Sequence, residues 1–168
     1  MSDALEFIRV NDEVLAKSVE SLAQEIWTEY YVPIIGKPQV DYMLKTFQSK
    51  DSIMRQLLQE NFQYYLIKRG EDLIGYIGMV PKDQDALFLS KFYLRARDRG
   101  QGYGKLMTYF VETKAREMGF TRIRLTVNKN NTGSVSAYLK MGFKNMGPII
   151  QDIGAGFFMD DYVMEKAL

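Results

Sequence analysis

The chain has 168 residues, of which 46% are hydrophobic, so it fits one domain with a sizeable core and is too apolar to be disordered. Its 22 Lys and Arg nearly balance its 21 Asp and Glu, which argues against a nucleic-acid partner. With no Cys and no His it lacks thiol nucleophiles, histidine bases, disulfides and the usual zinc ligands, so we expect no metal. No apolar run approaches the roughly 20 residues that span a bilayer. The first ten residues do not resemble a signal peptide, so we expect a cytoplasmic protein without a membrane partner.

The first third of the chain predicts a short strand followed by helices. The strand is expected over residues 5–10, and Asn11 or Asp12 is placed to cap the first helix. Apolar residues at helical spacing give this helix a buried stripe. They are Val14, Val19, Leu22, Ala23 and Ile26. An aromatic segment, residues 27–33, follows the stripe and ends in a proline, with Gly36 beyond it.

Two shorter helices are predicted next. One opens at Lys37-Pro38 and runs through Phe47, and the other begins at Asp51 or Ser52. Their apolar positions are Val40, Met43, Leu44, Ile53, Leu57 and Leu58.

The middle of the chain predicts an antiparallel meander of three strands. Residues 62–68 and 73–80 are apolar runs, and the four residues between them, 69–72, are a hairpin signal. The turn at residues 81–85 leads into a third strand at 87–94, which is almost entirely apolar or aromatic.

A helix is expected after this strand, from Leu106 to Met118. The next strand is predicted at 122–127. Asn130, Asn131 or Thr132 is placed to cap a short helix through Leu139, which Gly142 ends in left-handed geometry. Two closing strands are expected at 143–150 and 157–166.

The loop between the third strand and the following helix carries three glycines within five positions, Gly100, Gly102 and Gly104. Such bare backbone in front of a helix N-terminus suits an anionic phosphate. The spacing does not fit the dinucleotide fingerprint G-x-G-x-x-G. It also fails the Walker A pattern, because Arg99 stands where that pattern needs its first glycine. A glycine-rich turn that binds no ligand remains the alternative.

This loop reads R-x-x-G-x-G, directly after a strand, and resembles the acyl-CoA motif of the Gcn5-related N-acetyltransferase (GNAT) family. A second pattern, N-x-x-[AS]-x-x-x-Y-x-x-x-G-F, fits Asn131, Ser134, Tyr138 and Gly142-Phe143, one strand later and in the family's order. Alone, this second pattern is better explained by a helix cap beside a core tyrosine. Together, the two motifs identify the resemblance from about residue 62 to the C-terminus.

The resemblance implies an α+β fold of three layers, αβα. Its sheet is mixed and mostly antiparallel, is splayed open between strands four and five, and has helices on both faces. The chain is then one domain, 1–168. Within it, 62–168 form the acetyl-CoA-binding core and 1–61 supply variable helices on the acceptor side.

The resemblance also implies where acetyl-CoA binds as co-substrate. Phe92, Tyr93 and Leu94 are expected beside the pantetheine, with a bulge that aims the N–H of Phe92 or Leu94 at the acetyl oxygen. The loop is expected to hold the pyrophosphate through its backbone, Asn131 to bond the pantetheine, and Lys140 to reach a phosphate. The loop residues are Arg99, Gly100, Gln101, Gly102, Tyr103, Gly104 and Lys105. Lys91, Arg95 and Arg97 add positive charge nearby, although Asp98 among them also fits a solvated surface run.

The implied reaction is direct attack of an amine on the thioester. Tyr138 is the expected general acid for the leaving thiolate, because a phenol titrates near a thiol. The general base stays open. Many family members carry a glutamate on the fourth strand, where this chain has Phe88 and Ser90. The remaining candidates are Glu29, Asp160, Asp161 and a water chain.

The acceptor is expected to be a small cationic amine, because aromatic faces and carboxylates recognise ammonium groups. The N-terminal helices, the aromatic segment and the C-terminal ending also look similar to the spermidine/spermine acetyltransferase branch. The expected acceptor residues are Trp27, Glu29, Tyr30, Tyr31 and Asp160, together with Asp161. Core packing of Trp27 and one tyrosine is the competing interpretation.

Other functions stay open at this point. The missing strand-four carboxylate also suits a non-catalytic module that binds or senses acyl-CoA. Acetylation of a protein N-terminus or lysine differs only in the acceptor. The oligomeric state is open too, with a homodimer as one alternative.

Overall fold

The computed structural model describes residues 4–168, so the first three residues of the expected domain lie outside it. The chain divides into two units. The first unit takes in Met1–Val80 and Lys91–Gly104, and the second unit takes in Pro81–Ser90 and Lys105–Leu168. The expectation of one domain over 1–168 stays a prediction.

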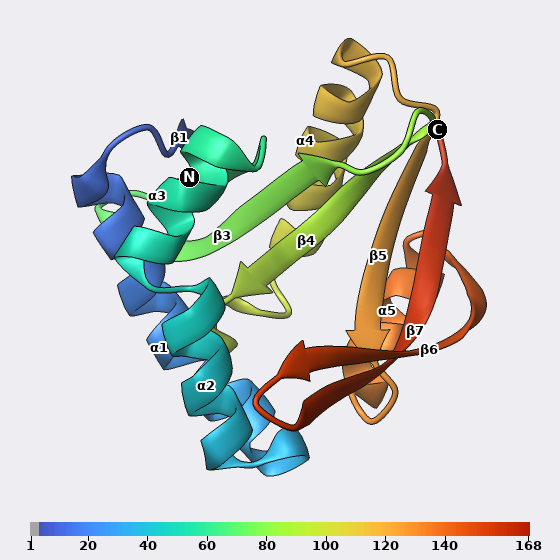
Figure 1. The fold of residues 1–168 in the computed structure, drawn as a ribbon. Coiled ribbons are helices and arrows are strands. Elements are labelled where there is room, and N and C mark those ends of the chain that lie inside the picture. The colour runs from blue at the N-terminus through green and yellow to red at the C-terminus, as the bar shows by residue number, and fades with distance from the viewer. Residues whose placement is uncertain (1–3) are drawn as a thin grey trace. The chain divides into compact units, whose positions relative to one another are not determined.

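The strands of the first unit form an antiparallel meander (Figure 1). β1 (Leu5–Arg9) pairs with β2 (Gln63–Arg69), and β2 pairs with β3 (Asp72–Pro81). Gly70 turns the β2–β3 hairpin with a φ of 60°, a conformation that favours glycine. The last four residues of β4 (Ala86–Leu94) also belong to this unit. These strands confirm the predicted meander.

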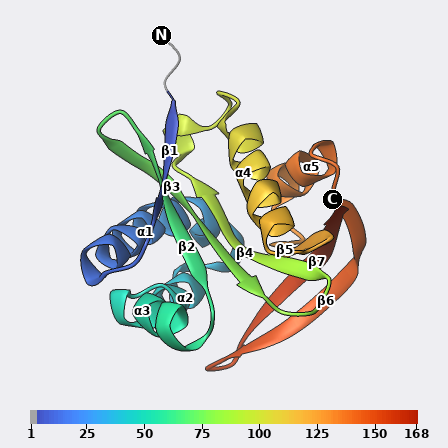
Figure 2. The ribbon, with the colours of Figure 1, turned by 90° about the horizontal axis from the view of Figure 1, so that it is seen from above.

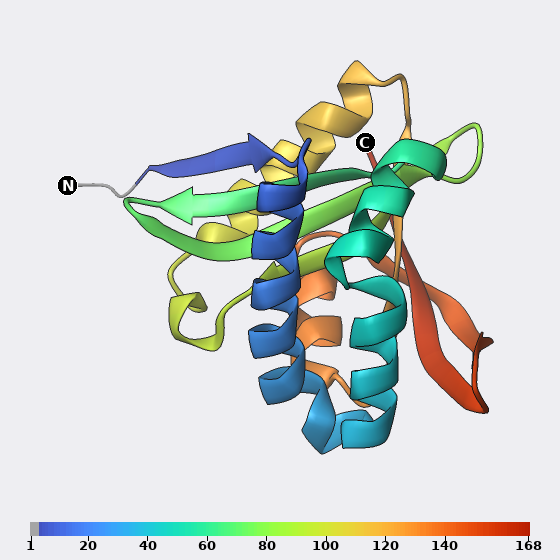
Figure 3. The ribbon, with the colours of Figure 1, turned by 60° about the vertical axis from the view of Figure 1, so that its left-hand side comes forward.

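Three helices complete the first unit, and Figure 2 shows them together on one side of β1, β2 and β3. They are α1 (Glu13–Ile35), α2 (Lys37–Phe47) and α3 (Lys50–Gln59). The long α1 runs beside the other two (Figure 3, blue and teal). Asp12 caps α1, accepting a hydrogen bond of 2.8 Å from the backbone N–H of Leu15, as predicted.

Four details of these helices differ from the prediction. Val14 is exposed, and Ala16 takes its place in the buried stripe of α1. Residues 27–33 are helical with Pro33 inside the helix, and Gly36 ends it. α3 starts earlier than expected, since Ser49 caps it. Leu58 points to solvent, with 77% of its surface exposed.

The core of the first unit contains a buried hydrogen-bond network. The hydroxyl of Tyr64 donates to Gln56 over 2.5 Å and accepts from Gln48, whose carbonyl oxygen accepts from Tyr76 over 2.7 Å. Burial raises the pKa of both tyrosines well above the usual value. The network fixes the α2–α3 connection on β2 and β3, because an unpaired amide or hydroxyl there would be costly.

The second unit contains the remaining sheet. The start of β4 pairs in parallel with β5 (Arg122–Asn128), and β5 pairs antiparallel with β7 (Phe157–Ala167). β7 pairs antiparallel with β6 (Lys144–Gly154). In Figure 2, α4 (Tyr103–Glu117) and α5 (Thr132–Lys140) lie close together beside this part of the sheet. Met107, Val111 and Ala115 give α4 its buried face.

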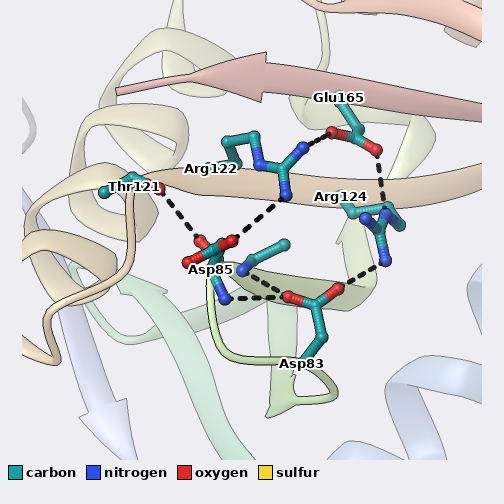
Figure 4. Close-up of polar contacts among 7 residues, drawn as sticks. Asp83, Asp85, Thr121, Arg122, Arg124 and Glu165 are labelled. Atoms are coloured by element: carbon teal, nitrogen blue, oxygen red, sulfur yellow. Dashed lines mark hydrogen bonds and ion pairs between the residues drawn. The ribbon is translucent and has the colours of Figure 1, made fainter.

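Ion pairs join the start of this sheet to the turn at residues 81–85 (Figure 4). Glu165 on β7 accepts from Arg122 and Arg124 of β5, over 3.1 and 3.0 Å. Arg124 also donates to Asp83 over 2.7 Å. These ion pairs thus hold the turn against β5, which β7 supports through Glu165.

The outermost strand, β6, is irregular at both ends. Its register with β7 shifts between Asn145 and Gly147 and again between Asp152 and Gly154. At each bulge the side-chain oxygen of the Asn or Asp accepts the N–H of the glycine, over 2.9 and 2.8 Å. These local bonds satisfy donors that the ladder no longer uses.

The strand order is β1-β2-β3-β4-β5-β7-β6. The single parallel pairing, β4 with β5, joins Ala86–Phe88 to Arg122–Arg124. The predicted α+β class with a mixed, mostly antiparallel sheet is confirmed. Within residues 4–168, no helix combines the length and hydropathy needed to cross a membrane.

Candidate active site

The loop after β4 has an open glycine-rich backbone. Gly100 and Gly102 have φ values of 76° and 84°, which L side chains rarely adopt, and α4 begins immediately afterwards at Tyr103. A Cβ built on Gly100, Gly102 or Gly104 meets no heavy atom within 4 Å. The backbone N–H groups at the start of α4 are therefore approachable by an anion, and the residues fit a bound phosphate.

An ion-pair cluster within the first unit holds this loop in shape. Arg95 donates through Nε to Asp98 over 2.8 Å, and Asp98 is 2% exposed. Arg69, at the end of β2, lies 3.5 Å from the same carboxylate and donates over 3.1 Å to the hydroxyl of Tyr103. The solvated surface run considered from the sequence is therefore wrong for Arg95 and Asp98, whose charges are buried against each other.

Arg99, the first residue of the R-x-x-G-x-G motif, turns back toward β4. Its Nε and Nη2 donate to the carbonyl of Leu94 over 3.2 and 2.9 Å. The guanidinium carbon lies 4.1 Å from the centroid of the Tyr30 ring on α1, a cation–π distance. One side chain thus connects the glycine loop, the end of β4 and the aromatic segment of α1.

The aromatic segment of α1 packs against the end of β4. Trp27 lies 5.7 Å from Tyr31 and 5.6 Å from Tyr93 between ring centroids, in edge-to-face arrangements. The hydroxyls of Tyr31 and Tyr93 are 3.1 Å apart. Trp27 is 2% exposed, so most of its surface is core, whereas Glu29 on the same helix is exposed. Phe92, Tyr93 and Leu94 are all half-buried.

The second motif places its residues in the second unit. Asn131 caps α5, accepting over 3.3 Å from the backbone N–H of Ser134. Tyr138 lies 5.5 Å from Phe143 between ring centroids and is half-buried. Lys140 is exposed in the last turn of α5, and Gly142 ends the helix with a φ of 95°. The predicted cap and stop of this helix are confirmed.

The two acidic residues of β7 differ sharply in environment. Asp160 is exposed and lies 2.7 Å from the Nζ of Lys129. Asp161 is 3% exposed, and burial raises the pKa of its carboxyl to about 6. Strand alternation explains the difference, because neighbouring side chains point to opposite faces.

The sequence of this chain matches the model of a known protein family. The model of the acetyltransferase (GNAT) family matches residues 19–143. The chain belongs to the GNAT family. The match includes β4, the glycine loop, Tyr138 and most of α1.

Individual relatives of this GNAT chain are distant. It is 26% identical to N-acetyltransferase 8B of Rattus norvegicus over 121 residues, which are 68% of this chain and 54% of that protein. The chain thus spans about half the length of that relative. It is 25% identical over 167 residues to spermidine N(1)-acetyltransferase of Thermoplasma acidophilum, covering 97% of both proteins.

A solved structure with a similar fold is the PaiA N-acetyltransferase from Thermoplasma acidophilum in complex with coenzyme A. The TM-score is 0.79 at 21% identity, and the alignment covers 98% of this chain and 99% of that one. At this identity the likeness supports the GNAT fold and nothing finer.

Sequence reasoning missed two features of the GNAT site. Arg69 lies about thirty residues from the loop it supports, and no local signal in the sequence connects them. The opposite charges of Arg95 and Asp98, three residues apart, could have indicated a one-turn pairing, which the short 3₁₀ helix Ala96–Asp98 provides. Among the described residues there is no group of three or more acidic side chains that could hold a metal ion.

Proposed function

We propose that this GNAT-family chain transfers an acetyl group from acetyl-CoA directly to the nitrogen of a small cationic amine such as a polyamine. The observation that carries the proposal is the open loop at Gly100–Gly104, with two positive φ values, in front of the N-terminus of α4. A backbone of this kind stabilises a pyrophosphate. Family membership agrees with the proposal.

Residues of the first unit have the chemistry to hold acetyl-CoA, which supplies the activated acetyl thioester. The backbone of residues 100–104 would hold the pyrophosphate, with Arg99 bracing the loop. Phe92, Tyr93 and Leu94 would contact the pantetheine with their half-buried side chains. In the second unit, Asn131 and Lys140 are proposed as further contacts, although Asn131 already uses its side-chain oxygen as a helix cap.

Tyr138 is proposed as the general acid. Its phenol donates a proton to the sulfur that leaves the acetyl group. A tyrosine suits this step because its ordinary pKa is close to that of a thiol, so neither direction of proton transfer is strongly uphill. The ring of Tyr138 packs edge-to-face on Phe143, and the side chain that carries the hydroxyl is half-buried.

The cationic acceptor is proposed from the charges and from one relative. The full-length relative in Thermoplasma acidophilum is named for spermidine, a polyamine. Glu29 and Asp160 are exposed carboxylates on α1 and β7 that can attract an ammonium group. Tyr30 and Tyr31 add aromatic edges, while Trp27 contributes mostly to the core.

Free-thiol release from acetyl-CoA tests the proposal with a panel of acceptors of matched length. The panel contains a diamine, a polyamine, a hydroxyalkylamine that lacks the second ammonium group, an amino acid, and peptides with a free N-terminus or a lysine. We expect thiol release to be fastest with the cationic small amines. Tight acetyl-CoA binding without thiol release from any acceptor would instead indicate a non-catalytic binding module. Preference for the peptides would indicate a protein acetyltransferase.

A further inference from the structure

Asp161 on β7 is a buried carboxyl group that the folded chain leaves incompletely satisfied. The residue is 3% exposed. Its Oδ1 is buried and has no hydrogen-bond partner within residues 4–168, while Thr126 is hydrogen-bonded to the carboxyl group. A buried acceptor atom without a partner is rare in native proteins and costs stability.

The neighbours of Asp161 in the sheet do not neutralise it. The residue pairs with Asn128 on β5 and with Ile149 on β6. The charged groups that act on it are Asp160, which disfavours its ionised form, and Lys129, which favours it. Lys129 is itself engaged, since its Nζ lies 2.7 Å from Asp160 and over the ring of Tyr162. The ionised carboxylate of Asp161 therefore lacks a hydrogen-bond donor at Oδ1 among the described residues.

A structural role does not account for an aspartate at this position. An asparagine has nearly the same shape, can accept the bond from Thr126, and carries no charge that must be desolvated. Burial of the charge instead raises the pKa of Asp161 to about 6, close to the pH at which a general base works best. Groups that lower stability in this way are enriched at functional sites.

The position of Asp161 also connects it with the helix that carries Tyr138. Its cross-strand partner Asn128 ends β5 and shapes the turn into α5. The Oδ1 of Asn128 accepts from the backbone N–H of Asn130 over 2.8 Å, and its carbonyl accepts from Asn131 over 3.0 Å. Asp161 thus lies one strand away from the entry to α5 within the second unit.

We propose that Asp161 is the general base, which removes a proton from the ammonium nitrogen of the acceptor. This inference depends on the proposed acetyl transfer. The carboxylate takes one proton, so the nitrogen lone pair is free to form the C–N bond at the thioester carbon as the C–S bond breaks. The phenol of Tyr138 protonates the leaving sulfur. It regains a proton when the nitrogen loses its second one. Asp161 then releases its proton to solvent, and the acetylated amine, the thiol and one proton are the products.

The test compares Asp161→Asn with Asp152→Asn, the same change at an exposed acid of β6 that has no part in the proposed site. Both variants are assayed with the fastest cationic acceptor of the panel and with its fluorinated analogue, whose amine is neutral at the assay pH. For Asp161→Asn we expect kcat to fall by about 10²–10⁴ with the cationic amine, the usual effect of losing one general base. The loss should be much smaller with the neutral analogue, which needs no deprotonation. Asp152→Asn should keep kcat within a few-fold of the wild-type value.

Two further measurements exclude a structural effect. Acetyl-CoA affinity by calorimetry should not change in Asp161→Asn, and its thermal midpoint should be equal to or above that of the wild type. Asp161→Ser serves as a second variant with the same expectation. An unchanged kcat, an equal loss with both acceptors, or a change in KM alone would overturn the role of Asp161. Absence of thiol release by the wild type with every acceptor would instead overturn the proposed function itself.

Discussion

The guanidinium of Arg99 lies over the ring of Tyr30, 4.1 Å from its centroid, while the same group donates twice to the carbonyl of Leu94. A positive charge of the chain itself thus covers one face of an aromatic ring that the sequence suggested for a cationic substrate. Under the proposed function, recognition of an acceptor cation would then depend more on carboxylates than on Tyr30. The contact also couples the order of the glycine loop to the order of α1.

This coupling predicts non-additive effects on stability. Arg99→Gln and Tyr30→Leu should each destabilise the protein, and a double-mutant cycle should give a coupling energy of about 0.5–1 kcal/mol. Urea unfolding measures the four free energies. Arg97→Gln combined with Tyr30→Leu is the control pair, because Arg97 is an exposed arginine two residues before Arg99. Additivity in the Arg99 cycle would show that the contact contributes nothing.

Gly104 offers a clean test of coenzyme binding. It is the second residue of α4, has no positive φ, and faces open space, so Gly104→Val should fold normally. The added side chain should block the approach of a phosphate to the backbone, and we expect acetyl-CoA affinity by calorimetry to fall at least 100-fold. Gly133→Val is the matched control, because Gly133 is the second residue of α5 and also faces open space. Equal affinities in the two variants would contradict the phosphate assignment of the loop.

Tyr138→Phe should separate chemistry from binding. The change keeps the ring against Phe143 and removes only the hydroxyl, so turnover should fall by about 10²–10⁴ while acetyl-CoA affinity stays the same. Single-turnover kinetics on quenched samples measures the chemical step. Tyr109→Phe, on an exposed tyrosine of α4, is the control. A variant with the full single-turnover rate would leave Tyr138 as a packing residue.

Asp161 also predicts how stability depends on pH. Its pKa is raised from 3.8 in the unfolded chain to about 6 in the folded protein, so the folded state binds the proton more tightly. The resulting stabilisation is complete below pH 3.8 and is lost as the pH rises through about 6. From pH 7 to pH 5 the wild type should therefore gain about 1 kcal/mol relative to Asp161→Asn.

The wild type must be compared with the variant because other acids change the pH dependence of stability in the opposite direction. A side-chain hydrogen bond from Lys17 lowers the pKa of Glu20, and backbone hydrogen bonds from Ala86 and Asp85 lower that of Asp83. Stability from these two groups is lost as the pH falls through their lowered pKa values. Urea unfolding of wild type and Asp161→Asn at pH 5, 6 and 7 isolates the difference. Parallel curves would show that the carboxyl of Asp161 is not perturbed.

The elements near the site were predictable where their signals are local. Positive φ values at Gly102 and Gly142 follow from glycine at a loop and at a helix end, and caps at Asp12 and Asn131 follow from side chains that accept backbone N–H groups. Two apolar runs and the hairpin signal between them likewise predicted β2 and β3 with small errors at their ends. These features need no knowledge of distant parts of the chain.

Features that depend on pairing between distant segments were not predictable. Nothing in the sequence indicates that Arg69 contacts Asp98, because the contact depends on where β2 ends beside the loop. The contrast between Asp160 and Asp161 depends on which face of β7 is buried, and that is set by its register with β5 and β6. Val14 was predicted to be buried in place of Ala16 because either residue fits a helical stripe. Only the rotation of α1 against the strands decides which of the two is buried.

The bulges of β6 have a consequence for behaviour at high protein concentration. An outermost strand with unpaired N–H groups is a template on which another chain can add a strand and start aggregation. In β6 the glycine N–H groups at both bulges are already bonded to Asn145 and Asp152, although Met146, Ile150 and Phe158 leave apolar surface exposed nearby. At these two positions the backbone donors are therefore not available to an added strand, and the exposed surface is that of side chains. Replacing Asn145 and Asp152 with alanine would free these two N–H groups to bind the strand of another chain.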